Sequence, residues 1–165
     1  MNAKKPIEAN KYRPNVAAVI LSERYPEVCE FFIAKRCDIK NTRCIWQFPQ
    51  GGIDSGESPL DALYRELDEE IGTNDIEILA EYPHWLRYDF PKDSIKAKMY
   101  PFSGQTQRYF LVKLKGEAKI NLATPVPEFI AYKFVPFDEV LGNVVYFKRR
   151  IYKKVLEYFK KGGYF

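Results

Sequence analysis

Hydrophobic and polar positions along this chain fall into short blocks that predict strands. Asn15 to Leu21 is a nearly continuous apolar run, typical of a strand that is buried on both faces. Apolar residues resume from Val28 to Lys35 after a turn, so these two segments predict a hairpin. Gln107 to Lys115 is the clearest later strand. Shorter strands are expected at 45–48, 75–82, 85–89 and 129–135, and longer loops at 36–43, 90–104 and 116–127.

Two other stretches have the spacing of amphipathic helices. In the first, Ser58 can cap the opening turn, Pro59 suits the first helical position and Gly72 ends the helix. Its apolar stripe consists of Leu60, Leu63, Tyr64, Leu67 and Ile71. The second helix repeats apolar residues at four-residue steps, at Phe147, Ile151, Val155 and Phe159, among the basic residues Lys148, Arg149, Arg150, Lys153 and Lys154. A single further helical turn is expected at 137–141.

This order of elements predicts an α/β fold in which a mixed sheet carries one helix on each side. The 165 residues allow one domain with a proper core, and we assign residues 15–165 to it. Residues 1–14 are expected to form a loosely held N-terminal arm. No internal repeat or domain boundary is visible in the sequence.

Composition narrows the class of protein further. An apolar content of 46% with 16% aromatic residues excludes a disordered chain. No apolar run is long enough for a membrane span, and the polar N-terminus lacks a signal core, so we expect a cytoplasmic protein. Cys29, Cys37 and Cys44 are odd in number and contain no CxxC motif. Reduced, partly buried thiols are therefore expected, and neither a zinc site nor a disulfide framework.

Charge is unevenly distributed along the chain. Glu66, Glu69 and Glu70 share an arc of roughly 100° on the first helix, away from its apolar stripe. Like charges on adjoining turns repel, and a hard divalent cation such as Mg²⁺ would relieve that repulsion. The alternative is an ordinary solvated acidic face. The formal net charge is +4 in spite of this helix, so basic residues gather elsewhere, which fits a polyanionic substrate.

The stretch from Gly51 to Gly72 decides between these alternatives. It resembles the Nudix box, which has a glycine, five residues, a glutamate, seven residues and then Arg-Glu-apolar-x-Glu-Glu-x-Gly-apolar. The matching positions are Gly51, Glu57, Arg65, Glu66, Leu67, Glu69, Glu70 and Gly72, and Thr73 stands where an aliphatic residue is usual. The resemblance implies an α/β/α sandwich, with the box helix on one side of a mixed central sheet and the C-terminal helix on the other. It also implies hydrolysis of a nucleoside diphosphate linked to another group.

The same resemblance implies roles for the box residues. Glu66, Glu69 and Glu70 would bind Mg²⁺ or Mn²⁺, in a site for two or more ions, with the backbone carbonyl of Gly51 as a further ligand. Glu57 would support them through water or through Arg65, whose role is to orient the carboxylates; its alternative role is a surface ion pair. The general base would be Glu69 or Glu128, and Glu128 could equally be a metal ligand.

Segments outside the box resemble a narrower group, the bacterial RNA 5′-pyrophosphohydrolases, which overlap in sequence with dinucleoside polyphosphate hydrolases. These segments are 12–16, 46–52, 105–110, 124–129 and 145–149. The resemblance implies that Arg13, Arg36 and Arg108 bind the 5′-triphosphate and that Val145, Phe147 and Lys148 grip a base. Phe147 could instead be the first core residue of the last helix, with Lys148 merely solvated.

Three functions follow as hypotheses. The first is a metal-dependent enzyme that converts the 5′-triphosphate or 5′-diphosphate of RNA to a 5′-monophosphate and so promotes mRNA decay. The second is a dinucleoside polyphosphate hydrolase of the diadenosine tetraphosphate type. The third, a non-catalytic RNA- or nucleotide-binding module, is disfavoured because the box has lost no glutamate. We take a monomer as the default, with no membrane partner.

Overall fold

A mixed β-sheet forms the centre of the computed structural model, which describes residues 11–37, 44–92, 99 and 101–165. Within these residues eight strands make one sheet, in the order β3-β2-β1-β7-β5, with β4 paired to β1, β6 to β7 and β8 to β2. Their bounds are Tyr12–Leu21 (β1), Glu30–Cys37 (β2), Cys44–Gln47 (β3), Gln50–Gly52 (β4), Ile76–Glu81 (β5), Leu86–Asp89 (β6), Gly104–Leu114 (β7) and Ala131–Pro136 (β8). β1 and β7 run parallel, and the other pairings are antiparallel.

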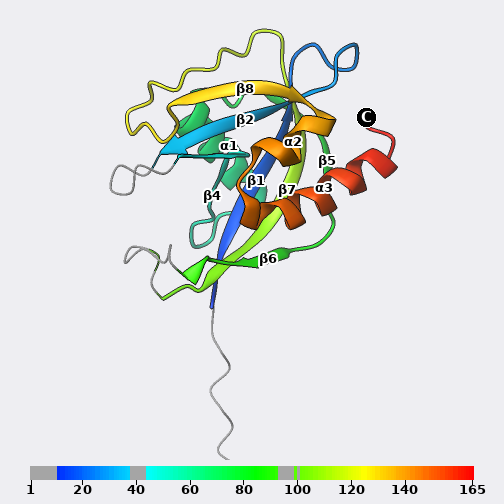
Figure 1. Cartoon of the computed structure of the whole chain (residues 1–165). Coiled ribbons are helices and arrows are strands. Elements are labelled where there is room, and N and C mark those ends of the chain that lie inside the picture. The colour runs from blue at the N-terminus through cyan, green and yellow to red at the C-terminus, as the bar shows by residue number, and fades with distance from the viewer. Residues whose placement is uncertain (1–10, 38–43, 93–98, 100) are drawn as a thin grey trace, which may run out of the picture.

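Helices cover both faces of this sheet (Figure 1). α1 (Pro59–Ile71) packs on one face; α2 (Phe137–Asn143) and α3 (Arg149–Lys161) pack on the other. A short 3₁₀ turn, η3 (Tyr146–Lys148), leads into α3. The α/β/α sandwich predicted from the sequence is therefore confirmed. None of the helices in the described part of the chain has the length and apolar content of a membrane-spanning segment.

The apolar run in β1 supplies both halves of the core. Successive strand side chains point to opposite faces of the sheet, so Val16, Ala18 and Ile20 join the α1 side, and Val19 and Leu21 join the α3 side. All five side chains are buried. A strand buried on both faces needs apolar residues at every position, which explains why this run does not alternate.

α1 begins and ends at the residues that the sequence indicated. The Ser58 hydroxyl accepts a hydrogen bond from the Asp61 N–H, and Gly72 ends the helix in the left-handed region at φ 71°. One position of the predicted apolar stripe is wrong, because Leu60 is 41% exposed and Ala62 is buried in the core. Leu60 lies in the first turn of α1, and the buried positions of the helix begin at Ala62 and Leu63.

Several strands are longer than predicted. β1 begins at Tyr12, inside the segment expected to be the arm, and residues 1–10 lie outside the described part of the chain. β7 begins at Gly104, because its first residues pair with the start of β1. β2 continues to Cys37, so Arg36 is a strand residue and not a loop residue. The predicted loops at 36–43 and 90–104 fall partly on residues that are not described.

The expectation that all three cysteines are reduced is wrong for two of them. Cys37 and Cys44 are directly opposite each other at the last pair of the β2–β3 ladder and form a disulfide. Spacing alone could not reveal this, because the pairing depends on the register of two strands that extend into a segment predicted as a loop. Cys29 is a free thiol.

Candidate active site

Arg65 connects the two acidic ends of the box. Its guanidinium donates two hydrogen bonds of 2.8 Å to the Glu57 carboxylate, one of 2.7 Å to Glu66 and one of 2.8 Å to the Gly52 carbonyl. The Arg65 bonds to Glu57, with one from the Asp54 N–H, lower the pKa of Glu57 to about 2. Arg65 therefore fixes the position of Glu66 and ties α1 to β4, as expected of an orienting residue.

Gly51 gives the Glu66 carboxylate its place. A Cβ atom at this position would lie 1.8 Å from the Glu66 carboxyl carbon, so only glycine lets the side chain rest on the strand. The pKa of Glu66 is raised, because burial outweighs the opposing effect of the Arg65 guanidinium. Glu66 and the Gly51 backbone thus lie side by side, as a shared cation would require.

Glu70 is the deepest carboxylate, at 2% exposure. Its Oε2 atom accepts a 2.9 Å hydrogen bond from the Gln50 N–H, whereas its buried Oε1 atom has no hydrogen-bond partner among the described residues. Burial, and then the charges of Glu128 and Glu66, raise the pKa of Glu70 well above its usual range. A buried carboxylate oxygen with no partner and like charges nearby is chemistry that a cation would complete.

The side chains of Glu69 and Glu128 differ in how closely they are paired with a cation. The Glu69 side chain is 59% exposed and lies 3.6 Å from Arg65. Glu128 accepts a 2.8 Å hydrogen bond from Arg36, whose predicted partner was a phosphate. Arg36 thus pairs with an acidic residue whose charge acts on Glu66 and Glu70.

The acidic side chains have the chemistry that a divalent cation needs, but they do not converge on one point. Among the residues that the structure describes, no three acidic, histidine or cysteine side chains converge as a ready-made metal cluster. Arg65 holds Glu66, and Glu69 faces solvent. The donor set itself, carboxylate oxygens with one buried oxygen free, is what Mg²⁺ and related hard cations prefer. We call Glu57, Arg65, Glu66, Glu69, Glu70 and Glu128 the carboxylate cluster.

A second group of polar side chains lies on the α3 side of β4. Lys148 is 3% exposed, and its ammonium donates hydrogen bonds of 2.8 Å to Gln47 Oε1 and 2.6 Å to Gln50 Oε1. It also lies 5.7 Å from the centre of the Tyr88 ring. Burial, with a smaller effect of the Arg36 charge, lowers the pKa of Lys148 to about 7. Lys148 is thus neither solvated nor part of α3.

Glutamines of β4 and β7 extend this group. The Gln50 Nε2 atom donates to Gln105 Oε1 at 3.1 Å, and Gln107 Nε2 donates to Asn15 Oδ1 at 2.7 Å. The Tyr88 hydroxyl donates to Gln105 at 2.6 Å. We call these residues, Asn15, Gln47, Gln50, Tyr88, Gln105, Gln107 and Lys148, the amide network. Gln50 connects this network to the carboxylate cluster, because its backbone N–H donates to Glu70.

The remaining predicted substrate residues fall in three places. Phe147 is half-buried in η3, with its ring centre 6.1 Å from that of Tyr88, so it is not the first residue of α3. Val145 lies beside it, and its N–H donates to the Trp46 carbonyl. Arg13 packs over Gly52, where a Cβ atom would lie 2.2 Å from its guanidinium nitrogen. Arg108 is bound to Glu81 and lies over the Trp85 ring.

Sequence reasoning missed Tyr88, Gln50, Gln105 and Gln107. A signal was present, because Gln105 and Gln107 alternate with period two in a strand that is otherwise apolar further along, and so point to one face. Two buried glutamines on one face of a strand need hydrogen-bond partners on that face. Tyr88 carried no comparable signal.

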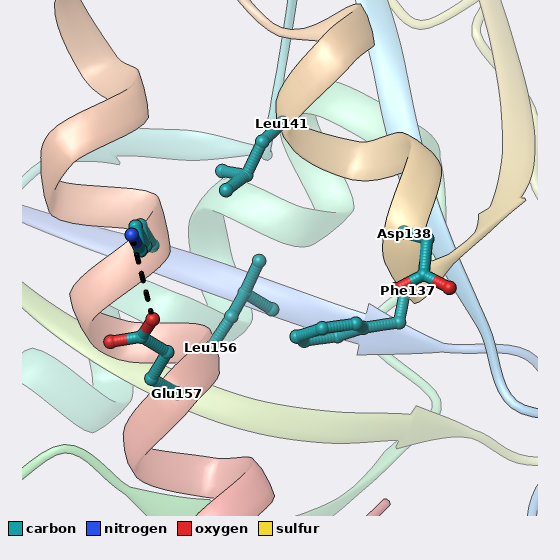
Figure 2. Close-up of a pocket in the computed structure, with 6 residues that line it drawn as sticks. Phe137, Asp138, Leu141, Leu156 and Glu157 are labelled. Atoms are coloured by element: carbon teal, nitrogen blue, oxygen red, sulfur yellow. Dashed lines mark ion pairs between the residues drawn. The ribbon is translucent and has the colours of Figure 1, made fainter.

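A separate cavity of about 200 Å³ lies between α2 and α3 (Figure 2). It is lined by Phe137, Asp138, Leu141, Lys153, Leu156 and Glu157, and Lys153 and Glu157 form an ion pair of 3.8 Å at its wall. No residue of the carboxylate cluster or the amide network lines it. It is therefore not the site of the box chemistry.

Residues 11–155 match the model of the NUDIX domain, which is most of the chain. The chain belongs to the Nudix family of hydrolases. Divalent metal ions are a general requirement of this family, in agreement with the donor set around Glu70.

Two groups of known proteins resemble this Nudix chain. An RNA pyrophosphohydrolase of a Nitratiruptor species is 64% identical over 96% of this chain and 100% of its own length. An RNA pyrophosphohydrolase of Helicobacter pylori is 58% identical over 93% of this chain and 97% of its own. Among solved structures, a C. elegans Ap4A hydrolase complex has a TM-score of 0.65 at 20% identity, over 89% of this chain and 96% of that one. At that identity the likeness shows the fold.

Proposed function

We propose that this protein hydrolyses phosphoanhydride bonds at the 5′ end of RNA, leaving a 5′-monophosphate. The observation that carries the proposal is the position of Gln50, which joins the carboxylate cluster to Lys148 and, through Lys148, to the rings of Tyr88 and Phe147. Cation chemistry for a polyphosphate thus lies next to two half-buried aromatic rings, the kind of side chain on which an unpaired base stacks. Relatives named RNA pyrophosphohydrolases support the same conclusion.

The cation would be Mg²⁺ or Mn²⁺, with two or more ions in the site. Glu66, Glu69, Glu70, Glu128 and the Gly51 carbonyl would hold them. When bound, such ions neutralise charge on the phosphate oxygens and make a bound water easier to deprotonate. The buried free oxygen of Glu70 supports this assignment most directly.

The chain's own residues perform the remaining tasks. Arg65 and Glu57 hold Glu66 in place through hydrogen bonds of 2.7 and 2.8 Å. We assign the proton-accepting role to Glu69, because its exposed carboxylate can reach water, whereas the Glu128 carboxylate is already hydrogen-bonded to Arg36. Glu128 then acts as a metal ligand whose carboxylate is positioned by its hydrogen bond from Arg36.

Arginine side chains and aromatic rings would recognise different parts of the RNA. Arg13 would bind the phosphate oxygens, and Arg36 and Arg108 would contribute less because Glu128 and Glu81 already pair with them. Val145, Phe147 and Lys148, with Tyr88, would bind a base at the 5′ end. We place this activity in a cytoplasmic monomer, where a 5′-monophosphate would expose transcripts to decay.

A side-by-side measurement of kcat/KM tests the proposal. The two substrates are a triphosphorylated RNA oligonucleotide with an unpaired 5′ end and diadenosine tetraphosphate, each with Mg²⁺ and with Mn²⁺. We expect the RNA to be preferred. A thousandfold preference for the dinucleotide would instead assign the protein to the dinucleoside polyphosphate hydrolases.

A further inference from the structure

The Cys37–Cys44 disulfide lies where a thiol from solution can reach it. β3 is the edge strand of the sheet in the order β3-β2-β1-β7-β5, and Cys44 is its exposed first residue. Cys37 is half-buried at the end of β2. Thiol–disulfide exchange needs access to one of the two sulfur atoms, and the Cys44 sulfur belongs to the more exposed residue.

The end of β2 that carries this disulfide also positions two charged residues of the active site. Arg36 immediately precedes Cys37 and donates its 2.8 Å hydrogen bond to Glu128. The backbone next to Glu128 is attached to the same point of the strand, because the Ile130 N–H donates to the Lys35 carbonyl at 2.9 Å. Three consecutive residues, Lys35 to Cys37, therefore hold Arg36, Glu128 and the disulfide together.

The pair of Arg36 and Glu128 includes one of the carboxylates that would hold the cation. The Glu128 carboxylate accepts its 2.8 Å hydrogen bond from Arg36, and its side chain is 38% exposed. Arg36 therefore sets both the position of this carboxylate and the charge beside it. A change in how Arg36 pairs with Glu128 changes the ligand that is offered to the cation.

We propose that Cys37 and Cys44 are a reversible thiol–disulfide site that controls the pairing of Arg36 with Glu128 and, through it, the hydrolase activity. This inference rests on the proposed function for its activity readout. The disulfide ties the last pair of a ladder whose edge strand has only four residues. Without it, the pairs Arg36↔Ile45 and Cys37↔Cys44 are held by backbone hydrogen bonds that water can replace at an edge.

The reductant is a dithiol, either a small molecule or a protein with two neighbouring cysteines. Its thiolate attacks the Cys44 sulfur, breaks the bond to Cys37 and forms a mixed disulfide, and Cys37 leaves as a thiolate. The second thiol of the reductant then displaces Cys44. Two electrons and two protons pass to the cysteine pair, and the reductant becomes a disulfide. A disulfide of the same class reverses the reaction.

The test uses the full chain equilibrated with mixtures of reduced and oxidised dithiothreitol. Alkylation followed by mass measurement counts free thiols, and kcat/KM on triphosphorylated RNA is measured in the same samples. We expect one reactive cysteine, Cys29, in the oxidised state and three in the reduced state, with kcat/KM lower by up to about tenfold on reduction, the lower end of what loss of a supporting partner costs. Three reactive cysteines at every mixture would overturn the site itself.

Matched variants separate the disulfide from general effects of reductant. A double variant, Cys37→Ser with Cys44→Ser, should be insensitive to dithiothreitol and behave like the reduced protein. Cys29→Ser should keep the full response. Arg36→Gln should lower activity and abolish the response, because the contact that transmits it is gone. Equal kcat/KM in the two thiol states of the unaltered chain would overturn the coupling.

A second readout keeps the redox proposal independent of the RNA substrate. Mn²⁺ affinity, measured on the same oxidised and reduced samples, reports on the carboxylates that Glu128 influences. We expect it to differ severalfold between the two states, and equal affinities would contradict the coupling. If RNA is not hydrolysed in either state while Mn²⁺ affinity still follows the thiol count, the proposed function fails and the redox site stands.

Discussion

On the α1 side of β4 the polar side chains are carboxylates paired with Arg65 and Arg36, whereas on the α3 side they are amides, a tyrosine and a lysine, with Arg13 beside them. The carboxylate cluster is incomplete, because Glu70 Oε1 is buried without a partner among the described residues. The amide network is nearly complete, with Gln47 Nε2 as its exception. Carboxylates with an unpartnered buried oxygen are suited to bind a cation. Side chains whose hydrogen bonds are already made are suited to hold a fixed geometry.

The alternation of a single three-residue strand produces this division. Gly51 points toward α1 and receives Glu66, whereas Gln50 and Gly52 point the other way, toward Lys148 and Arg13. The backbone N–H of Gln50 then binds Glu70. The residues for hydrolysis and those for binding the base therefore lie on opposite faces of one strand. Substitutions on the α1 side should mainly lower kcat, and substitutions on the α3 side should mainly raise KM.

Replacing Glu70 with Gln should have the largest effect on activity of all the substitutions in the carboxylate cluster. The amide removes the charge that a cation would bind, and we expect kcat to fall more than about 100-fold, since even supporting partners of a ligand cost 10–100-fold. Turnover of triphosphorylated RNA and Mn²⁺ affinity measure the effect. Glu77→Gln, an exposed glutamate of β5, is the control and should behave as the unaltered protein. Unchanged turnover of every phosphate substrate by Glu70→Gln would refute the metal site.

A pair of alanine substitutions compares the two sides of β4 directly. Gly51→Ala forces the Glu66 carboxylate away, and we expect kcat to fall about 10–100-fold. Gly52→Ala moves the Arg13 guanidinium and should mainly raise KM. Both clashes involve the ends of flexible side chains, so each variant should lose only about 1–3 kcal/mol of unfolding free energy.

Steady-state kinetics with one RNA substrate distinguishes the two alanine variants. Gly142→Ala is the control, since no atom lies within 4 Å of the added Cβ. If Gly51→Ala and Gly52→Ala changed kcat and KM in the same way, the two sides of β4 would not have separate roles.

The sequence predicted those parts of the fold that depend on local chemistry. Ser58, Pro59 and Gly72 bound α1 as expected, because capping depends on a few neighbouring residues. The apolar run of β1 predicted a buried strand because burial on two faces leaves no polar position. The acidic arc was also visible, since Glu69 and Glu70 lie three and four residues after Glu66 on one helix, and its role in holding a metal stays a prediction.

What the sequence could not predict depends on register between distant segments. Gln107 meets Gln50 across 57 residues, and Lys148 meets Gln47 across 101. Neither contact follows from composition or spacing. The same holds for Arg36, which the strand register turns toward Glu128, and for the disulfide of Cys37 with Cys44.

Replacing Lys148 with Met should change how stability depends on pH. The folded pKa is lowered to about 7 from 10.5, so between these values the unfolded chain holds a proton that the folded chain does not. Stability of the unaltered protein therefore rises with pH in this window, by up to about 1.4 kcal/mol per pH unit, and this contribution is constant below it. Lys148→Met should remove the slope.

Denaturant unfolding from pH 7 to 9 measures that slope. Tyrosines and Cys29 contribute equally to the unaltered protein and to the variant, so the difference between the two slopes reports on Lys148. Lys153→Met changes an exposed lysine of α3 and should leave the slope unchanged. A slope that survives in Lys148→Met would mean that Lys148 is charged throughout this range, with the amide network stabilising an ammonium and not an amine.

Arg108→Gln should have the smallest effect, which sharpens the boundary of the phosphate site. Glu81 already pairs with the Arg108 guanidinium, and Trp85 lies beneath it, so little charge is free for a phosphate. We expect KM for triphosphorylated RNA to change less than about threefold, in line with the small energies of exposed ion pairs. Arg13→Gln, on the α3 side of β4, should raise KM about tenfold or more, because it removes a charged hydrogen-bond donor worth about 1.5–3 kcal/mol. An equal rise in KM in the two variants would mean that the phosphate site extends across the sheet to β7. Substrate binding would then not be confined to the α3 side of β4.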